Sequence, residues 1–407
     1  MRKIFFIANN NIGDSGLSGG DRICVELAKR WRTKTEVVFV ATEEAITIYK
    51  KNGLGELLFY KTSDKVDQKD VFSLKAILCN FFKKLFNGVC FVIKNEQIFK
   101  DKAFVYSISD FYPDSIPAFL IKLMNPDSIW IAGFYLFASP PWQKNSPYKG
   151  KNALRGFLYW LSQQPVYWIV RSWADIVFVT SEPDRAKFIT KKRDVSKVIV
   201  IRGGVDIEEA KRYAQTQNIK DVNQKIYDGC FIGRFHLQKG VLVLVDIWKE
   251  VLKLRPSAKL AMIGNGPLEG EVRRKAVELG IMDHLELFGF LDYQKKFDVF
   301  KQSKIVLHPA TFDSGGMAAA EAMAWGLPGI GFDLEALKTY YSKGMIKVPL
   351  LDIKCFAQEI VRLLSDRDHF ENVAKEARDF IFQEWNWEKR ADCVFDQLLR
   401  SCPNGIM

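Results

Sequence analysis

The sequence predicts an α/β protein built from two doubly wound parallel sheets, each covered by helices on both faces. Short apolar runs that are typical of strands alternate with helix-like segments along the chain, which is the pattern of such sheets. The chain has 407 residues, and two domains of roughly 200 residues each are the natural expectation for this length. Glycine-bearing loops follow strands in both halves, at the sheet edge where folds of this class bind ligands.

In the first half, runs of β-branched and aromatic residues predict the strands. These runs cover residues 3–8, 37–40, 104–107, 128–132, 176–179 and 198–201. A loop rich in Gly, Asn and Ser follows the first run, and a helix is expected from Asp21 to about Trp31. The apolar core of the first run is too short for the central region of a signal peptide, so we interpret it as a buried strand.

The second half repeats the alternation after a polar boundary. Its predicted strands cover residues 227–232, 259–263, 284–288, 305–307 and 329–332, and a helix is expected over 241–253. Residues 206–223 have neither an apolar period nor a β-branched run, which places the boundary there. We therefore predict a first domain over residues 1–205, a linker over 206–225, a second domain over 226–380, and a C-terminal helix over 381–407 that returns toward the first domain.

The composition is typical of a soluble globular protein and argues against several other classes. Apolar residues make up 48% of the chain and charged residues 26%, and no apolar stretch approaches the roughly 20 residues that cross a bilayer. The seven cysteines include no C-x-x-C pair and no metal-ligand spacing. This usage is typical of reduced thiols in a cytoplasmic protein.

The net charge of +11 is concentrated in the first half. Residues 1–205 hold 31 Lys and Arg against 19 Asp and Glu, whereas residues 206–407 hold 28 against 29. Such an excess most often means a solvated basic surface. It also fits an acidic partner, such as an anionic membrane surface, a phosphorylated acceptor or nucleic acid.

One loop of the second half carries the strongest functional pattern. Glycines let a backbone approach a ligand closely, and a helix start offers N–H groups and a positive dipole end to an anion. Two carboxylates, eight residues apart, bracket this arrangement, and we predict a phosphate site between them rather than only a helix cap. The candidate residues of the loop and of the small-residue helix after it are Asp313, Ser314, Gly315, Gly316, Met317, Ala318 and Glu321.

Loops after the other strands add cations and glycines. Arg234 and Lys239 flank the turn after residues 227–232, and a pair of fixed cations beside glycines suits a diphosphate leaving group. Each cation alone would most often be only solvated. Because these loops follow strands of one sheet, we expect four of them to converge on one site. The weaker signals, in these loops and at the start of the first half, are Gly19, Gly20, Gly233, Gly264, Gly266 and Phe290.

Together these residues resemble a known family. The second half is similar to the donor domain of the retaining glycosyltransferases of family GT4 (glycosyl transferases group 1), which have the GT-B fold. The matching runs are residues 232–240, 260–267, 285–289 and 312–328, with looser matches to the acceptor domain at 19–28, 173–181 and 198–206. The resemblance implies two Rossmann-like domains that face a central cleft.

The resemblance also assigns roles to the candidate residues. Arg234 and Lys239 would bind the diphosphate of a nucleotide sugar, and the amides of residues 315–318 would hold the distal phosphate and the sugar. Glu321 matches the second glutamate of the family's E-x7-E element, which contacts the nucleotide ribose. Asp313 stands where the first glutamate contacts sugar hydroxyls. Since Asp313 is one methylene shorter, we expect it to shift the sugar or to select a different one.

The first half departs from the family at the acceptor site. Many members have a histidine near the reacting sugar, but this chain has no histidine before His236. The segments expected to line this region are residues 109–114 and 131–135. Asp110 or Asp114 is a candidate to orient the acceptor.

The implied activity is retaining, metal-independent transfer of a hexose-type sugar from a nucleotide-diphosphate sugar, with no cofactor. Asp-x-Asp occurs only at residues 366–368, far from the site loops, which is why we expect no metal. The expected acceptor is a lipid-linked sugar, or another glycan or glycolipid precursor, and the expected location is the cytoplasm or the inner membrane face.

Two segments leave the membrane question open. Residues 71–86 and 154–161 mix aromatic and aliphatic residues with Lys or Arg. Such segments form either core-facing amphipathic helices, which are the more common, or interfacial helices on anionic lipid. The charge excess of the first half favours a membrane-proximal acceptor.

The sequence leaves two alternatives to this activity open and argues against a third. A protein of the same fold could bind nucleotide sugars without turnover, or it could be a nucleotide-sugar epimerase that needs no acceptor. A nucleic-acid-binding protein is not expected, because the chain lacks a helix-turn-helix, zinc or aromatic-sheet signature.

Overall fold

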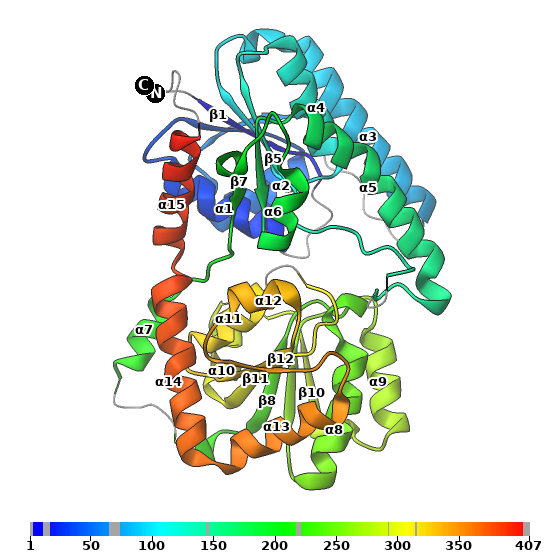
Figure 1. Cartoon of the computed structure of the whole chain (residues 1–407), viewed down its shortest axis with the longest axis vertical. Helices are drawn as coiled ribbons and strands as arrows, with labels where there is room; N and C mark the ends of the chain where they lie inside the picture. Colours follow the sequence, from blue (N-terminus) through cyan, green and yellow to red (C-terminus); the bar gives the residue numbers. More distant parts are fainter. Residues whose placement is uncertain are drawn as a thin grey trace. The chain divides into compact units, whose positions relative to one another are not determined.

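The computed structural model describes residues 3–10, 17–64, 74–143, 146–216, 221–291, 293–313 and 316–401. The chain divides into two compact units (Figure 1). Unit 1 comprises residues 1–140, 151–203 and 388–407, and unit 2 comprises residues 141–150 and 204–387. Each unit contains one parallel sheet covered by helices, so the prediction of two doubly wound sheets is confirmed.

In the described part of unit 1, the strands pair in the order β3-β2-β1-β4-β5-β6-β7, and every pair is parallel. The chain moves outward from β1 on one side and then returns to the other side at β4, so the β1–β4 boundary is the switch point where such sheets bind ligands. The strands are β1 (Ile4–Ala8), β2 (Val37–Ala41), β3 (Leu58–Lys61), β4 (Phe104–Ser107), β5 (Ile129–Gly133), β6 (Ile176–Val179) and β7 (Val198–Val200). The helices are α1 (Gly19–Trp31), α2 (Glu43–Tyr49), α3 (Leu74–Lys94), α4 (Tyr112–Met124), α5 (Ala153–Trp173), α6 (Glu182–Phe188) and α15 (Trp387–Arg400).

Helix α15 joins unit 1 by packing on α1. The Trp31 indole N–H donates to the carbonyl of Ala391 at 3.0 Å, and Lys34 forms an ion pair with Asp392 at 2.7 Å. Helix α1 itself begins with a capping box, in which Ser18 and Asp21 satisfy each other's backbone N–H groups. The last helix of the chain therefore completes the unit that the first strand begins.

Helices α3, α4 and α5 form one layer of unit 1, with α4 between the other two (Figure 1). On α5, the side that faces the sheet presents Val166 and Val170 to the core, whereas Leu154, Leu158 and Leu161 are exposed. Helix α5 therefore packs on the core with one side and presents an apolar stripe to solvent with the other.

In the described part of unit 2, the strands pair in the order β10-β9-β8-β11-β12-β13, again all parallel. The switch point lies between β8 and β11, and it is there that the sequence placed its strongest candidates. The strands are β8 (Tyr227–Ile232), β9 (Leu260–Ile263), β10 (Leu285–Gly289), β11 (Ser303–His308), β12 (Gly329–Phe332) and β13 (Met345–Val348). The helices are α7 (Glu208–Ala214), α8 (Val241–Leu254), α9 (Glu269–Glu278), α10 (Tyr293–Lys301), α11 (Met317–Met323), α12 (Glu335–Tyr340), α13 (Ile353–Ser365) and α14 (Arg367–Glu384).

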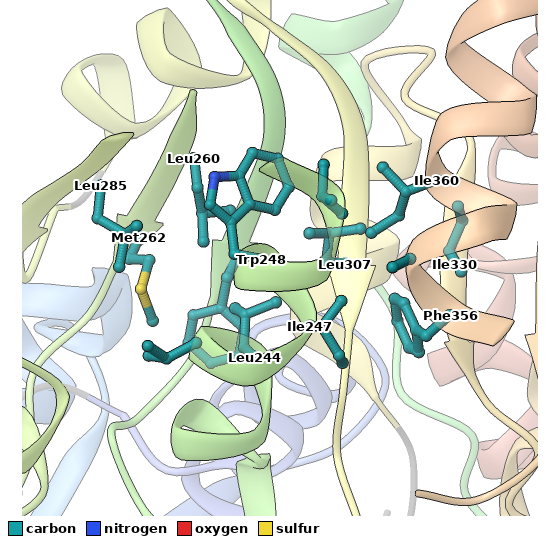
Figure 2. Packing of buried hydrophobic residues seen from close by; sticks show 14 of the residues in the cluster. Leu244, Ile247, Trp248, Leu260, Met262, Leu285, Leu307, Ile330, Phe356 and Ile360 are labelled. Carbon is teal, nitrogen blue, oxygen red and sulfur yellow. The ribbon is translucent and has the colours of Figure 1, made fainter. Parts of the chain in front are cut away.

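One hydrophobic cluster fixes the sheet of unit 2 against α8 and α13 (Figure 2). Trp248 of α8 is fully buried, and Gly229 of β8 leaves room for it, since a Cβ at Gly229 would lie 3.2 Å from the indole ring. Phe356 and Ile360 of α13 extend the cluster beyond α8. This packing holds the first turn of α8, and with it the loop after β8, in a fixed place.

Three features of the structure differ from what the sequence predicted. The edge strands β3 and β13 were not expected, because an edge strand is short and has a weaker apolar pattern than a central one. The predicted linker, residues 206–225, contains helix α7, whose Ala210 is buried together with the preceding Ile207. Two buried side chains in a short helix are too few to produce a visible helical period in the sequence.

Candidate functional site

Four loops of unit 2 meet at the carboxyl edge of its sheet, as predicted. Backbone hydrogen bonds join them: Phe235 N–H donates to Asn265 at 2.8 Å, and Gly264 N–H donates to Gly289 at 2.7 Å. On the other side, Thr311 N–H donates to the Gln238 carbonyl at 3.0 Å. The loops after β8, β9, β10 and β11 therefore form one hydrogen-bonded assembly.

Two glycines make this close packing possible. Gly240 has a φ of 66°, and a Cβ there would lie 1.9 Å from the carbonyl oxygen of Pro309. Gly264 has a φ of 132°, and a Cβ there would lie 1.9 Å from the carbonyl oxygen of Gly233. No other residue type fits either position without moving a neighbouring backbone.

Lys239 and Asp313 meet at the switch point between β8 and β11. The Lys239 Nζ lies 2.7 Å from the Asp313 Oδ2, and the His308 Nε2 lies 3.3 Å from the same oxygen. The Asp313 and His308 side chains are nearly buried, whereas Lys239 keeps about a third of its side chain exposed. His308 is the last residue of β11, and nothing in its local sequence indicates this contact.

The electrostatics of Asp313 follow from these neighbours. Burial alone would raise the pKa of its carboxyl group, because a charge loses hydration in the interior. The charge of Lys239 and the contacts with His308 outweigh burial and hold the pKa of Asp313 well below its ordinary value. Asp313 is therefore a carboxylate at neutral pH, and it fixes the position of the Lys239 ammonium group.

Glu321 lies on α11 and forms a second ion pair. The Lys296 Nζ of α10 lies 2.6 Å from the Glu321 Oε2, and both side chains are largely buried. Lys296 therefore holds the carboxylate of Glu321 within the small-residue helix α11. No local pattern distinguishes Lys296 from the other lysines of residues 295–301.

The junction between the site loop and α11 is fixed by a tyrosine. Gly316, with a φ of 56°, caps the helix, and its carbonyl accepts a hydrogen bond from the Tyr341 hydroxyl. The Tyr341 ring stacks on Trp385 at 5.2 Å between ring centroids. A Cβ at Gly316 would lie 3.1 Å from the Tyr341 ring and 3.3 Å from His308 Nε2. Tyr341 could not be predicted as a site residue, because it lies outside every run that resembles the family.

The other predicted residues of unit 2 are placed as follows. Arg234 is exposed in the loop after β8, and Phe290 is exposed just after β10. Met317 and Ala318 are half-buried in the first turn of α11, where helix N–H groups have no acceptor within the helix. Ser314 and Gly315 lie outside the described residues.

A cavity of about 300 Å³ lies beside the turn between β8 and α8. Its lining is mainly aliphatic and includes Leu237, Val241, Leu268, Leu350 and Leu351. None of the ionic residues described above lines it, so it is not the predicted diphosphate site.

Unit 1 holds a separate set of predicted residues. Gly19 and Gly20 begin α1, and a Cβ at Gly20 would lie 3.1 Å from the Tyr135 ring. Asp110 accepts a hydrogen bond from the Gln163 amide at 2.7 Å, and burial raises its pKa to about 6 despite that bond. Asp110 follows β4, at the ligand-binding edge of its sheet.

Asp114 lies in the interior of unit 1. It accepts N–H groups from Asn9 at 2.6 Å and Asn10 at 3.0 Å, as well as the hydroxyl of Ser109. The Asp114 side chain is fully buried, and burial raises its pKa to about 7, while these three hydrogen bonds oppose the shift. Asp114 therefore fixes the end of β1, whereas Asp110 is the better candidate to contact an acceptor.

The residues of this site lie in a part of the chain that resembles a known family. Residues 212–380 match the model of the family described as glycosyl transferases group 1. Unit 2 is therefore similar to the group 1 glycosyltransferases over these residues. The match contains Arg234, Lys239, Asp313 and Glu321.

Curated relatives match only part of the chain. An uncharacterized glycosyltransferase of Methanocaldococcus jannaschii is 25% identical over 188 residues, which are 45% of this chain and 47% of the relative. The GDP-mannose-dependent monoacylated alpha-(1-6)-phosphatidylinositol monomannoside mannosyltransferase of Corynebacterium glutamicum is 26% identical over 159 residues, 37% of this chain and 41% of the relative. The matches span about half the length of these curated relatives.

Solved structures show the same fold over nearly the whole chain. The Anabaena protein HepE, solved with UDP and glucose, has a TM-score of 0.69 at 13% identity and covers 98% of this chain and 99% of its own. The Staphylococcus aureus protein TarM, solved with UDP, has a TM-score of 0.71 at 12% identity with the same coverage. The fold is therefore GT-B, as the sequence predicted.

Proposed function

We propose that this protein is a glycosyltransferase that moves a sugar from a nucleotide-diphosphate sugar to an acceptor with retention of configuration. The observation that carries the proposal is the Lys239–Asp313 pair at the switch point of unit 2, within loops that are hydrogen-bonded to one another. Arg234 adds a second, exposed cation to the loop after β8. Two cations suit the charge of a departing diphosphate.

The chemistry follows from how charge develops. Breaking the bond between the anomeric carbon and the phosphate oxygen places negative charge on the diphosphate and positive charge on the sugar ring. Lys239, held in position by Asp313, and Arg234 would stabilise the former, and preorganised groups of this kind contribute about 3 kcal/mol each. The acceptor oxygen then bonds to the same face of the anomeric carbon, and its proton passes to the departing phosphate oxygen. Glu321 would bind the ribose of the nucleotide.

We propose a lipid-linked sugar, or another glycan precursor near a membrane, as the acceptor. The printed name of the Corynebacterium relative describes transfer to a phosphatidylinositol mannoside, which supports an acceptor of this kind. UDP in the HepE and TarM structures supports a nucleotide-diphosphate donor. No cofactor or metal enters the proposed step, because Arg234 and Lys239 supply the positive charge.

The test begins with a thermal-shift screen of UDP-, GDP- and ADP-sugars against the full chain. The sugar that stabilises the protein is then incubated with it, and the configuration of the released or transferred sugar is followed by NMR spectroscopy. We expect a first product with the anomeric configuration of the donor, formed equally well with and without EDTA. Inversion would overturn the retaining mechanism, and loss of turnover with EDTA would overturn metal independence.

Two other outcomes identify the remaining candidate functions. Binding of a nucleotide sugar without hydrolysis or transfer to any glycan or lipid-linked acceptor would indicate a binding protein. Release of an epimerised sugar from the donor alone would indicate an epimerase. Either result would contradict the proposed transfer.

A further inference from the structure

Two helices of unit 1 carry apolar stripes on the side that faces away from the sheet. On α3 the stripe consists of Leu78, Phe82, Phe86 and Ile93, and on α5 it consists of Leu154, Leu158, Leu161 and Trp168. Phe86 is 67% exposed, Leu154 is 68% exposed and Trp168 is 60% exposed. These eight residues are named here the outer face. Groups of large exposed apolar side chains often mark a contact with another protein or with a membrane.

Packing explains why these stripes point outward on both helices. On α3, Gly88 lies against α4, where a Cβ would be 3.0 Å from Pro117, and Phe81 packs on Tyr112. On α5, Val166 and Val170 enter the core on the opposite side from the stripe. Both helices have therefore already used one side for packing within unit 1, and the outer face is additional to it.

The charge of this helical layer has one sign. The only carboxylate in α3, α4 and α5 is Asp114, which is fully buried. Exposed cations lie beside the stripes, namely Lys83 and Lys94 on α3 and Arg155 on α5. An apolar surface bordered by cations matches the pattern of interfacial helices that bind anionic lipid.

We propose that the outer face docks unit 1 on an anionic lipid surface. A second copy of the chain fits this face less well, because two such faces would bring like charges together. Among the described residues, no helix is both long and apolar enough to cross a membrane, so the contact would be interfacial. The link from this surface to a lipid-linked acceptor rests on the proposed function, whereas lipid binding itself does not.

Vesicle co-sedimentation of the full chain tests the proposal. The probes are vesicles of phosphatidylcholine alone and of phosphatidylcholine with phosphatidylglycerol, at low and high salt. We expect binding to the anionic vesicles, weakened by salt because exposed charges are screened. The double variants Phe82→Ser/Phe86→Ser and Leu154→Ser/Leu158→Ser should each raise the lipid concentration for half-maximal binding by about tenfold or more, since they remove inserted apolar area.

A further variant and a matched control distinguish the contribution of charge to vesicle binding from the contribution of apolar area. Lys83→Gln/Arg155→Gln should weaken binding to anionic vesicles and reduce its salt dependence. Leu254→Ser/Val277→Ser removes equally exposed apolar side chains from unit 2, where Leu254 is 56% and Val277 is 64% exposed, and should leave vesicle binding unchanged. All four substituted apolar positions of the outer face are exposed, so the thermal unfolding midpoint should stay within about 2 °C of the parent's.

Three results would overturn the proposal. The first is that the parent chain does not bind anionic vesicles. The second is that the outer-face variants and the unit 2 control lose vesicle binding equally. The third is that the chain self-associates without lipid and the outer-face variants abolish this self-association. Nucleotide-sugar binding, measured on the same variants by thermal shift, should be unchanged. Vesicle binding without nucleotide-sugar binding would leave this inference standing and refute the proposed function instead.

Discussion

Asp313 is held from two directions, by Lys239 of the loop after β8 and by His308 at the end of its own strand. The sequence comparison with E-x7-E predicted that Asp313 contacts sugar hydroxyls. In the structure its Oδ2 is engaged by both partners, so a role in positioning Lys239 fits the geometry better. The shorter side chain of aspartate keeps this carboxylate close to the strand end.

A double-mutant cycle tests the positioning role of Asp313. Asp313→Asn should lower turnover by about tenfold to hundredfold, because Lys239 loses the charge that orients it. The affinity for free nucleoside diphosphate should change less, since the Lys239 charge remains. In combination with Lys239→Ala, the two losses should be non-additive by about 1 kcal/mol or more. Additive losses in turnover would show that Asp313 acts independently of Lys239.

The raised pKa of Asp114 should make the free energy of unfolding of unit 1 depend on pH. Burial raises its pKa to about 7, whereas an unfolded aspartate has a pKa of about 3.9. Between these values the unfolded state releases the proton that the folded state keeps, so stability falls as the pH rises from about 4 to about 7 and then levels off. Asp114→Asn should remove this component, and thermal unfolding of both proteins across this pH range measures it. A difference in midpoint that does not vary with pH would contradict the assignment.

At the scale of elements, the turn between β8 and α8 decides whether the site can form. Gly240 has positive φ and lies against Pro309 of the loop after β11, so this turn joins the two strands of the switch point. Lys239 immediately precedes Gly240. Any residue with a Cβ at position 240 must push these loops apart.

Gly240→Ala should therefore disrupt the site, and Gly280→Ala is its matched control. Gly280 has a nearly identical φ of 65°, but a Cβ there meets nothing within 4 Å. The control should cost only the strain of a left-handed alanine, about 1 kcal/mol. Gly240→Ala should destabilise the protein further and lower nucleotide-sugar affinity at least about tenfold. Equal unfolding midpoints and affinities for the two variants would show that the contact with Pro309 is unimportant.

The elements that could be predicted from the sequence are those whose pattern is local. Central strands such as β8 and β12 were predicted with their observed bounds, because strands buried on both faces are continuous apolar runs. The ionic partners of the site could not be predicted in the same way. Lys296 and His308 become informative only when the fold brings them to Glu321 and Asp313, and nothing in their local sequence distinguishes them from structural residues.

For the whole molecule, the sequence predicted two doubly wound units, and each observed sheet has a switch point where its strand order reverses. The domain boundaries were harder to predict, because residues 141–150 cluster with unit 2 although they lie within the first half of the chain. Long-range association of this kind has no local signature. The cleft between the units, the acceptor and the role of each site residue remain predictions.

Titration calorimetry of the full chain with the stabilising nucleotide sugar tests the central claim most directly. The parent chain should bind it at a single site, and Lys239→Ala should weaken binding by about tenfold to hundredfold, because it removes a charge-assisted contact. Lys275→Ala removes a comparable ion pair with Asp246 elsewhere in unit 2 and should bind like the parent. Failure of the parent to bind any nucleotide sugar, or equal losses in both variants, would contradict a donor site at the Lys239–Asp313 pair.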